Sequence, residues 1–118
     1  MNDADTTIET LRQAMRRFVA EREWEKFHTP KNLAMSLAIE AAELMEHFQW
    51  LEPAESHAVA GSPKTVAEVA DELADVMCYA LSLANVLQLD VSNAVMGKLA
   101  KNALKYPADR FRGRFRAD

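Results

Sequence analysis

Two pairs of acidic residues, each with a spacing of three, are the side chains in this sequence best suited to chemistry. Glu40 and Glu43 form the first pair, and Glu72 and Asp75 form the second. Residues three apart on an α-helix lie on one face, so each pair directs two carboxylates the same way. If the two helices packed antiparallel, four carboxylates would converge and repel one another unless a cation lay between them. Such oxygen ligands suit Mg²⁺, Mn²⁺ or Ca²⁺ better than zinc or copper, so we expect a hard-metal site.

Apolar periodicity predicts that both acidic pairs lie on α-helices. The first pair belongs to a helix that starts at Thr29-Pro30, a cap followed by a favourable first residue, and runs to about Trp50. The second belongs to a helix opened by Thr65-Val66-Ala67-Glu68, which has the form of a capping box. An apolar seam from Val66 to Leu87 follows, as expected of a bundle core or a subunit interface. Residues 53–64 contain prolines and a glycine and form the connection, with room for one short helical turn.

Two further helices are predicted near the ends of the chain. A first helix, capped by Asp5 or Thr6, runs to about Arg22. A last helix, capped by Asp90, ends at Tyr106-Pro107. No strand-like alternation is present, so the predicted fold class is all-α.

The composition is that of one globular domain. The chain has 118 residues, 49% of them hydrophobic, which is enough to bury a core. We expect residues 1–109 to form a single bundle of four to five helices and residues 110–118 to form a basic tail. A net charge of −4 disfavours duplex nucleic acid as a partner. Cys78 is the only cysteine and no apolar run approaches the ~18 residues of a membrane span, so we expect a cytoplasmic protein with no membrane partner.

Aromatic and cationic residues fall in step with the acidic pairs. Trp50 and Tyr79 follow the two pairs at helical spacing, so we expect them to lie on the same faces. The segment from Trp24 to His28 places two aromatic rings and a histidine within five residues. Amide and ammonium groups that could bind phosphates share one face of the last helix: Lys98, Asn102 and Lys105.

The order of these motifs resembles the MazG-like nucleoside triphosphate pyrophosphohydrolases, and within them the dCTP pyrophosphatase branch. The resemblance spans about residues 8–107 and is carried by Trp24-Glu25-Lys26-Phe27-His28-x-Pro30-x-Asn32-Leu33, by Glu40-x-x-Glu43 with Phe48-Gln49-Trp50, by Glu72-Leu73-Ala74-Asp75-Val76 with Tyr79, and by Lys98-x-x-x-Asn102-x-x-Lys105-Tyr106-Pro107. It implies an all-α, MazG-like helix bundle that assembles into oligomers, as a homotetramer or a dimer. It also implies Mg²⁺-dependent hydrolysis between the α and β phosphates, which releases a nucleoside monophosphate and pyrophosphate.

The resemblance also implies a role for each matching position. The Mg²⁺ ligands, with Mn²⁺ as a possible substitute, would be Glu40, Glu43, Glu72 and Asp75. The nucleoside would be surrounded by Trp24, Glu25, Lys26, Phe27, His28, Trp50 and Tyr79, and the phosphates would meet Lys98, Asn102 and Lys105. The catalytic base could be Glu43 or Glu46, and the residues do not choose between them. Two departures, Met15 in place of a substrate-contacting histidine and Ala103 in place of an arginine, leave the base preference open.

The expected function is therefore a nucleotide diphosphatase that converts dCTP or a modified dCTP to dCMP and pyrophosphate, as in housecleaning of the nucleotide pool. Two alternatives from other classes remain. A carboxylate-bridged di-iron or di-manganese helical protein also collects acids from facing helices, although it normally adds Glu-x-x-His pairs, which the two acidic pairs lack. A non-catalytic helical interaction module would explain the apolar seam but not the alignment of acids, tryptophans and lysines.

Overall fold

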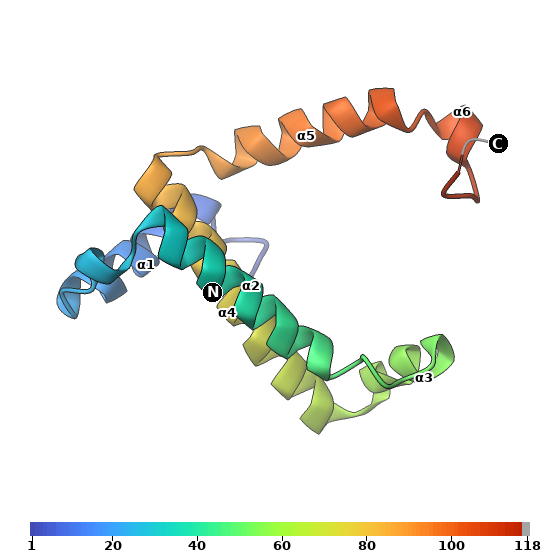
Figure 1. The fold of residues 1–118 in the computed structure, drawn as a ribbon, viewed down its shortest axis with the longest axis horizontal. Helices are drawn as coiled ribbons and strands as arrows, with labels where there is room; N and C mark the ends of the chain where they lie inside the picture. Colours follow the sequence, from blue (N-terminus) through green and yellow to red (C-terminus); the bar gives the residue numbers. More distant parts are fainter. Residues whose placement is uncertain (117–118) are drawn as a thin grey trace. The chain divides into compact units, whose positions relative to one another are not determined.

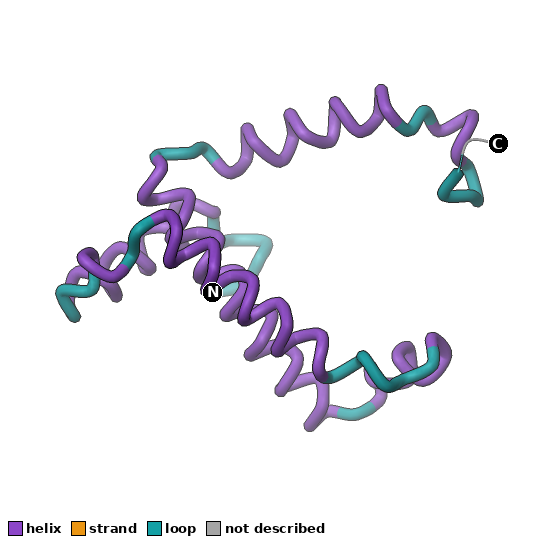
Figure 2. Tube along the Cα trace, in the orientation of Figure 1, coloured by secondary structure: helices purple, strands orange, loops and turns teal. Residues whose placement is uncertain are grey.

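The computed structural model describes residues 1–116, which form α-helices and short 3-10 turns without any strand (Figures 1 and 2). The all-α prediction is therefore confirmed. The chain divides into two compact units, Met1–Gln88 and Leu89–Asp118, and each is described by itself. The prediction that residues 1–109 form one domain stays a prediction. Ala117 and Asp118, the end of the predicted basic tail, lie outside the described residues.

A long antiparallel pair of helices dominates the first unit. Helices α2 and α4 lie side by side and run in opposite directions, and α1 packs against α4 (Figure 1). The elements of the unit, in chain order, are α1 (Ile8–Glu21), the 3-10 turn η1 (Glu25–Phe27), α2 (Pro30–Glu46), α3 (Pro53–Ala58), the 3-10 turn η2 (Val59–Gly61) and α4 (Pro63–Leu87).

Local capping explains where α2 begins and corrects where it ends. The Thr29 side chain accepts a hydrogen bond from the backbone N–H of Asn32 at 3.1 Å, and Pro30 is the first helical residue, as predicted. The helix stops at Glu46, four residues before the predicted end at Trp50. The N–H of His47 bonds to the carbonyl three residues back, a tighter turn that closes the helix. Trp50 therefore does not lie on the helical face of the acidic pair.

Two predicted helix caps are wrong, the first by one or two positions and the second by three. Thr7, rather than Asp5 or Thr6, caps α1, because its hydroxyl accepts from the N–H of Thr10 at 3.1 Å. Ser62, rather than Thr65, caps α4, and Pro63 occupies the first position, where its missing N–H costs nothing. The predicted capping box therefore lies inside the helix, and the connection before α4 is shorter than expected.

The buried core of the first unit lies where α1, α2 and α4 meet. Its apolar side chains are Val19, Leu33, Leu81 and Ala84, each at most 8% exposed. The predicted apolar seam of α4 is not uniformly buried, because Leu83 is half-buried whereas Val66 and Leu73 are 42% and 50% exposed. A helix pair that leaves such residues in water has apolar surface available for a partner.

A sharp turn after α1 directs the chain into η1. The N–H of Trp24 bonds to the carbonyl of Val19 at 3.0 Å, and the N–H of Glu23 bonds to that of Ala20 at 3.1 Å, which is a Schellman motif. Glu23 has the left-handed φ of 51° that this turn requires. The turn brings the Trp24 ring edge-on to Phe18, with ring centroids 5.9 Å apart.

The second unit consists of α5 (Val91–Lys105) and α6 (Ala108–Phe111). Asp90 caps α5 as predicted, accepting from the N–H of Asn93 at 2.8 Å. The ring of Phe111 packs edge-on against Tyr106 at 5.2 Å. The first two residues of the predicted tail are therefore part of a short helix that folds back on the end of α5.

Candidate metal centre and adjoining cavity

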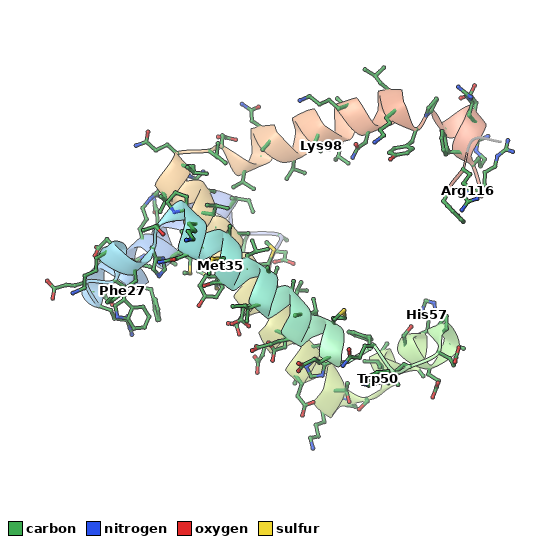
Figure 3. The ribbon with its side chains drawn as sticks, viewed as in Figure 1. Phe27, Met35, Trp50, His57, Lys98 and Arg116 are labelled. Carbon is green, nitrogen blue, oxygen red and sulfur yellow. The ribbon has the colours of Figure 1, made fainter. Side chains whose placement is uncertain are left out.

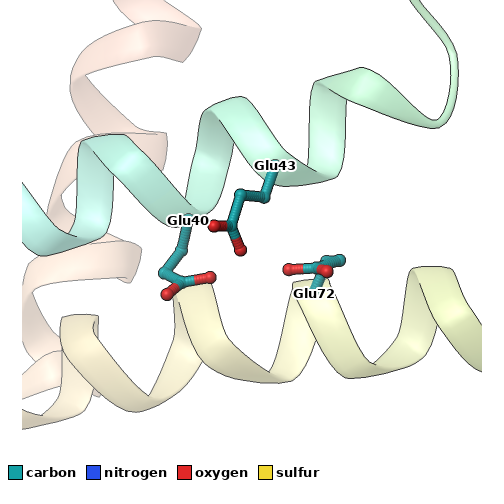
Figure 4. A group of neighbouring side chains, drawn as sticks. All are labelled: Glu40, Glu43 and Glu72. Carbon is teal, nitrogen blue, oxygen red and sulfur yellow. The ribbon is translucent and has the colours of Figure 1, made fainter.

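Three carboxylates from facing helices converge at the middle of the α2 and α4 pair. Glu40 and Glu43 project from α2 and Glu72 projects from α4 (Figure 4). One oxygen atom of each carboxylate lies within 4.8 Å of the others, and all three residues are half-buried. The helical spacing of three and the antiparallel packing are sufficient to produce this arrangement.

The carboxylates of this cluster, which we call the Glu40/Glu43/Glu72 cluster, form no ion pair with a basic residue among the described residues. Glu40 Oε2 and Glu72 Oε2 are buried from water and accept no hydrogen bond from residues 1–116. The ion pairs of the same residues involve α1 and its end, Arg16 with Glu9 and Arg22 with Glu21. Buried carboxylate oxygens without donors are costly, so the cluster is suited to an external cation.

The electrostatic cost appears in the ionisation of the cluster. A proton shared with Glu43, partial removal from water and the charges of Glu43, Asp75 and Glu72 together raise the pKa of Glu40 from 4.5 to about 7. Partial removal from water, followed by a proton shared with Glu43, also raises the pKa of Glu72, and the nearby His47 opposes this shift. At neutral pH and without a cation, the cluster therefore retains a proton that a cation would displace.

The chemistry of the donors fits a hard divalent cation. Mg²⁺ and Ca²⁺ hold oxygen ligands at about 2.0–2.6 Å, so oxygens on opposite sides of one ion lie about 4–5 Å apart. The three cluster oxygens, all within 4.8 Å of one another, meet that requirement. The cluster contains no histidine or cysteine, the ligands that favour zinc, and no Glu-x-x-His pair of the di-iron kind.

Asp75 connects the cluster to a neighbouring cavity. Its oxygens are not among the three that lie within 4.8 Å, yet its charge raises the pKa values of Glu40 and Glu72. Asp75 also lines a cavity of about 340 Å³, and its charge, after burial, is the second cause that raises the pKa of Cys78 there. The predicted fourth ligand therefore lies between the cluster and the cavity.

Aromatic side chains form much of the cavity wall. Helix α1 and the segment after it supply one side and α4 supplies the other, and the lining residues are Met15, Phe18, Trp24, His28, Asp75, Cys78 and Tyr79. Three of the predicted nucleoside contacts, Trp24, His28 and Tyr79, are thus brought together beside a carboxylate. Flat rings and sulfur atoms around a space of this size suit an aromatic ligand.

The other predicted nucleoside contacts lie outside this cavity. Glu25 lines a neighbouring cavity together with His28. Phe27 is 57% exposed, and the Lys26 ammonium lies 5.2 Å from the centre of its ring. Trp50 is 87% exposed. Figure 3 shows Phe27 and Trp50 beyond opposite ends of α2, whose 17 residues span about 25 Å.

The residues predicted to bind the phosphates lie on α5, and the predicted base Glu46 lies at the end of α2. Lys98, Asn102 and Lys105 lie on one face of α5, in the second unit, and their role stays a prediction. Lys105 places its ammonium 5.2 Å from the centre of the Tyr106 ring. Glu46 is the exposed last residue of α2.

Three cavity residues received no positive role from the sequence. Met15 was noted only as a departure from the family pattern and Cys78 only as the single cysteine, and Phe18 was assigned no role. A helical projection could have found them, because Phe18 is three residues after Met15 and Cys78 is three residues after Asp75. In the part of the chain that the structure describes, no helix combines the length and apolarity needed to cross a membrane.

Known proteins resemble this chain over most of its length. Residues 35–114 match the model of the MazG-like family. The chain is 40% identical to rat dCTP pyrophosphatase 1 over 109 residues, 92% of this chain and 64% of the relative. It is 39% identical to the human protein of that name over 104 residues, 88% of this chain and 61% of the relative. The chain thus spans somewhat less than two thirds of these relatives.

A solved structure agrees with these matches. The crystal structure of a pyrophosphatase from Archaeoglobus fulgidus is 42% identical and superposes with a TM-score of 0.79, over 91% of this chain and 98% of that one. The family match covers α4, α5 and most of α2, and so includes the whole Glu40/Glu43/Glu72 cluster. On these grounds, the chain belongs to the MazG-like family.

Proposed function

We propose that this protein is a nucleoside triphosphate pyrophosphohydrolase that requires a divalent cation, Mg²⁺ in the cell, and cleaves between the α and β phosphates. The observation that carries the proposal is the Glu40/Glu43/Glu72 cluster, in which two buried oxygens lack any donor. The divalent cation that accompanies a triphosphate would supply the missing positive charge, which a protein interaction module would not need. The matches to proteins named dCTP pyrophosphatase 1 support dCTP or a modified dCTP as the substrate.

The cavity beside the cluster would hold the nucleoside. Trp24 and Tyr79 offer rings on which a base can stack, and His28 offers a polar group at the edge. Asp75 would lie at the point where the nucleoside joins its phosphates. Lys98, Asn102 and Lys105 would then donate to the outer phosphates, which leave as pyrophosphate.

The chain's own residues would prepare the attack in two ways. Glu40, Glu43, Glu72 and Asp75 would hold the cation, with Mn²⁺ able to substitute for Mg²⁺. When bound, the cation neutralises charge that develops at the α-phosphorus and orients the phosphates. The aromatic cavity would fix the nucleoside so that the α-phosphorus faces the cluster.

Water would supply the oxygen that enters. It attacks the α-phosphorus, the bond from that phosphorus to the α–β bridging oxygen breaks, and pyrophosphate leaves with the bridging oxygen. Glu43 or Glu46 would accept the proton from the water. Glu46 is the exposed member of the pair, whereas Glu43 belongs to the cluster. The products would be the nucleoside monophosphate and pyrophosphate.

The test is a panel of nucleoside triphosphates with Mg²⁺ in which pyrophosphate and phosphate are measured separately. Pyrophosphate and dCMP from dCTP are expected, and release of phosphate alone would contradict the proposal. Glu43→Gln and Asp75→Asn should each abolish turnover while helical circular dichroism is retained. Glu52→Gln, on the connection outside the cluster, is the matched control and should retain full activity.

We further propose that the protein forms a homo-oligomer, a dimer or a tetramer. Apolar side chains stand in water along both long helices, among them Met35 and Ile39 on α2 and Leu73 and Met77 on α4, each 45–57% exposed. A second copy would cover them. Assembly would also agree with the prediction that Trp50 contacts the nucleoside. Trp24 precedes α2 and Trp50 follows it, so Trp50 could reach only a nucleoside bound to another protomer. Light scattering would measure the mass directly, and a monomer would contradict this proposal.

A further inference from the structure

Arg12 of α1 is a buried cation with no carboxylate partner. Its side chain is 8% exposed, yet no ion pair of residues 1–116 includes it. A buried charge is retained only where other polar groups compensate for the lost water. The polar groups that contact Arg12 must therefore compensate for its charge.

Three hydrogen bonds connect Arg12 to the end of α4. Its Nε donates to Asn85 Oδ1 at 2.9 Å, and its Nη2 donates to the carbonyl of Ala84 at 3.3 Å. In return, Asn85 Nδ2 donates to the backbone carbonyl of Arg12 at 3.1 Å. The Asn85 amide thus meets both the side chain and the main chain of one residue, which fixes the rotation as well as the distance of α1 against α4.

The counter-charge for Arg12 is the end of a helix. Ala84 lies in the last turn of α4, which ends at Leu87, and carbonyls in this position carry the negative end of the helix dipole. A cation at this end is favourable without any carboxylate. The contact therefore works only when the last turn of α4 and the second turn of α1 meet in one register.

The walls of the nucleoside cavity depend on that register. Met15, one turn after Arg12, and Phe18 form its α1 side, whereas Cys78 and Tyr79, before Asn85 on the same helix, form its α4 side. Arg12 lines neither this cavity nor the neighbouring one, and Asn85 lines only the neighbouring one. By contrast, the Glu40/Glu43/Glu72 cluster lies on α2 and α4 and includes no residue of α1.

We propose that Arg12 and Asn85 are positioning residues that hold α1 at the distance from α4 at which the cavity accepts a nucleoside. The inference rests on the proposed function, because it assigns nucleoside recognition to that cavity. Loss of either partner would loosen the α1 wall and weaken nucleotide binding, while the cation site and the reacting atoms keep their geometry.

The test compares Arg12→Lys, Arg12→Met, Asn85→Leu and the double variant Arg12→Met with Asn85→Leu, in the full chain. Each single variant should raise the KM for dCTP about tenfold and leave kcat and the Mg²⁺ concentration for half-maximal activity within about twofold. The double variant should raise KM no further than the singles, because both remove one contact. Arg12→Lys keeps the charge but not the paired donors, so it should behave like Arg12→Met.

Thr7→Ala is the matched control for lost helix stability. It removes the cap of α1 without touching Arg12, Asn85 or the cavity, and should lower the melting temperature with KM unchanged. If the Arg12 and Asn85 variants lower the melting temperature but leave KM unchanged, the contact is only structural and the proposal is overturned. Effects on KM that multiply in the double variant would also overturn it.

A binding-independent measurement separates this proposal from the proposed function. Wild-type protein that hydrolyses no nucleotide would refute the function, but Trp24 fluorescence would still report the α1 wall. In a Trp50→Phe background Trp24 is the only tryptophan. Arg12→Lys should shift its emission to longer wavelength, because the ring leaves the cavity for water. Emission identical to that of the Trp50→Phe protein would show that the contact between Arg12 and Asn85 does not position this wall.

Discussion

Acid should weaken cation binding with a midpoint near neutrality. Because the pKa of Glu40 is about 7, a cation must displace a proton from the cluster below that pH. For a single proton with this pKa, the apparent affinity for Mg²⁺ at pH 6 is about elevenfold weaker than that of the fully ionised cluster. At pH 8 it is nearly equal to that of the fully ionised cluster. The raised pKa of Glu72 acts in the same direction and would steepen the fall.

The metal-free protein should show the complementary trend in stability. The pKa of Glu40 is raised from 4.5 to about 7 on folding, so ionising it destabilises the folded state. Stability without a cation should therefore fall as pH rises through the window from 4.5 to about 7. Excess Mg²⁺ should cancel that fall, because it stabilises only the folded, ionised cluster.

Isothermal titration calorimetry with Mg²⁺ or Mn²⁺ at pH 6, 7 and 8 would measure the affinities, and thermal melts with and without cation would measure the stabilities. Glu40→Gln is the informative variant, since it should bind more weakly but lose most of the pH dependence near 7. Glu9→Gln on α1, outside the cluster, should keep the wild-type profile. Affinity for Mg²⁺ that is equal at pH 6 and pH 8 would refute the electrostatic reasoning.

Four further predictions test separate parts of the account. Glu23→Gly should raise the free energy of unfolding by about 0.5–1 kcal/mol in urea, since glycine adopts the left-handed φ of 51° without strain, and a loss of stability would contradict the turn geometry. Leu33→Ala should lower it by about 2–5 kcal/mol, because this side chain is 1% exposed, whereas a cost below about 1 kcal/mol would mean that the site is not a packed core. Trp24→Ala should weaken nucleotide binding, measured by calorimetry, by about 1–3 kcal/mol, and unchanged affinity would remove it from the base site. Ile39→Glu should reduce the mass measured by light scattering, while an unaltered mass would exclude this face of α2 from the oligomer contact.

Local signals in the sequence were sufficient for some helix ends and not for others. Thr29 before Pro30, and Asp90 before Val91, are isolated caps whose side chains can act only on the next turn, and both were predicted correctly. Ser62 and Thr65 are two possible caps three residues apart, and only the backbone decides between them. The apolar pattern of α2 continues past Glu46 into Phe48, so nothing in the sequence marks the actual end of the helix.

The sequence likewise predicts one part of the candidate site and not the other. The convergence of Glu40, Glu43 and Glu72 follows from helical spacing and one antiparallel packing, both of which the sequence indicates. The α1 wall of the cavity depends on a contact between Arg12 and Asn85, 73 residues apart, and no periodicity connects such residues. Trp50 was placed by continuing a helical period past the point where the helix stops.

Anomalous diffraction from crystals grown with Mn²⁺ and a non-hydrolysable dCTP analogue would test the central claim most directly. The account predicts a manganese peak within about 2.0–2.6 Å of oxygens from Glu40, Glu43 and Glu72, with the triphosphate bound to the same ion. A peak at some other group of residues, or a nucleotide bound away from this cluster, would contradict it.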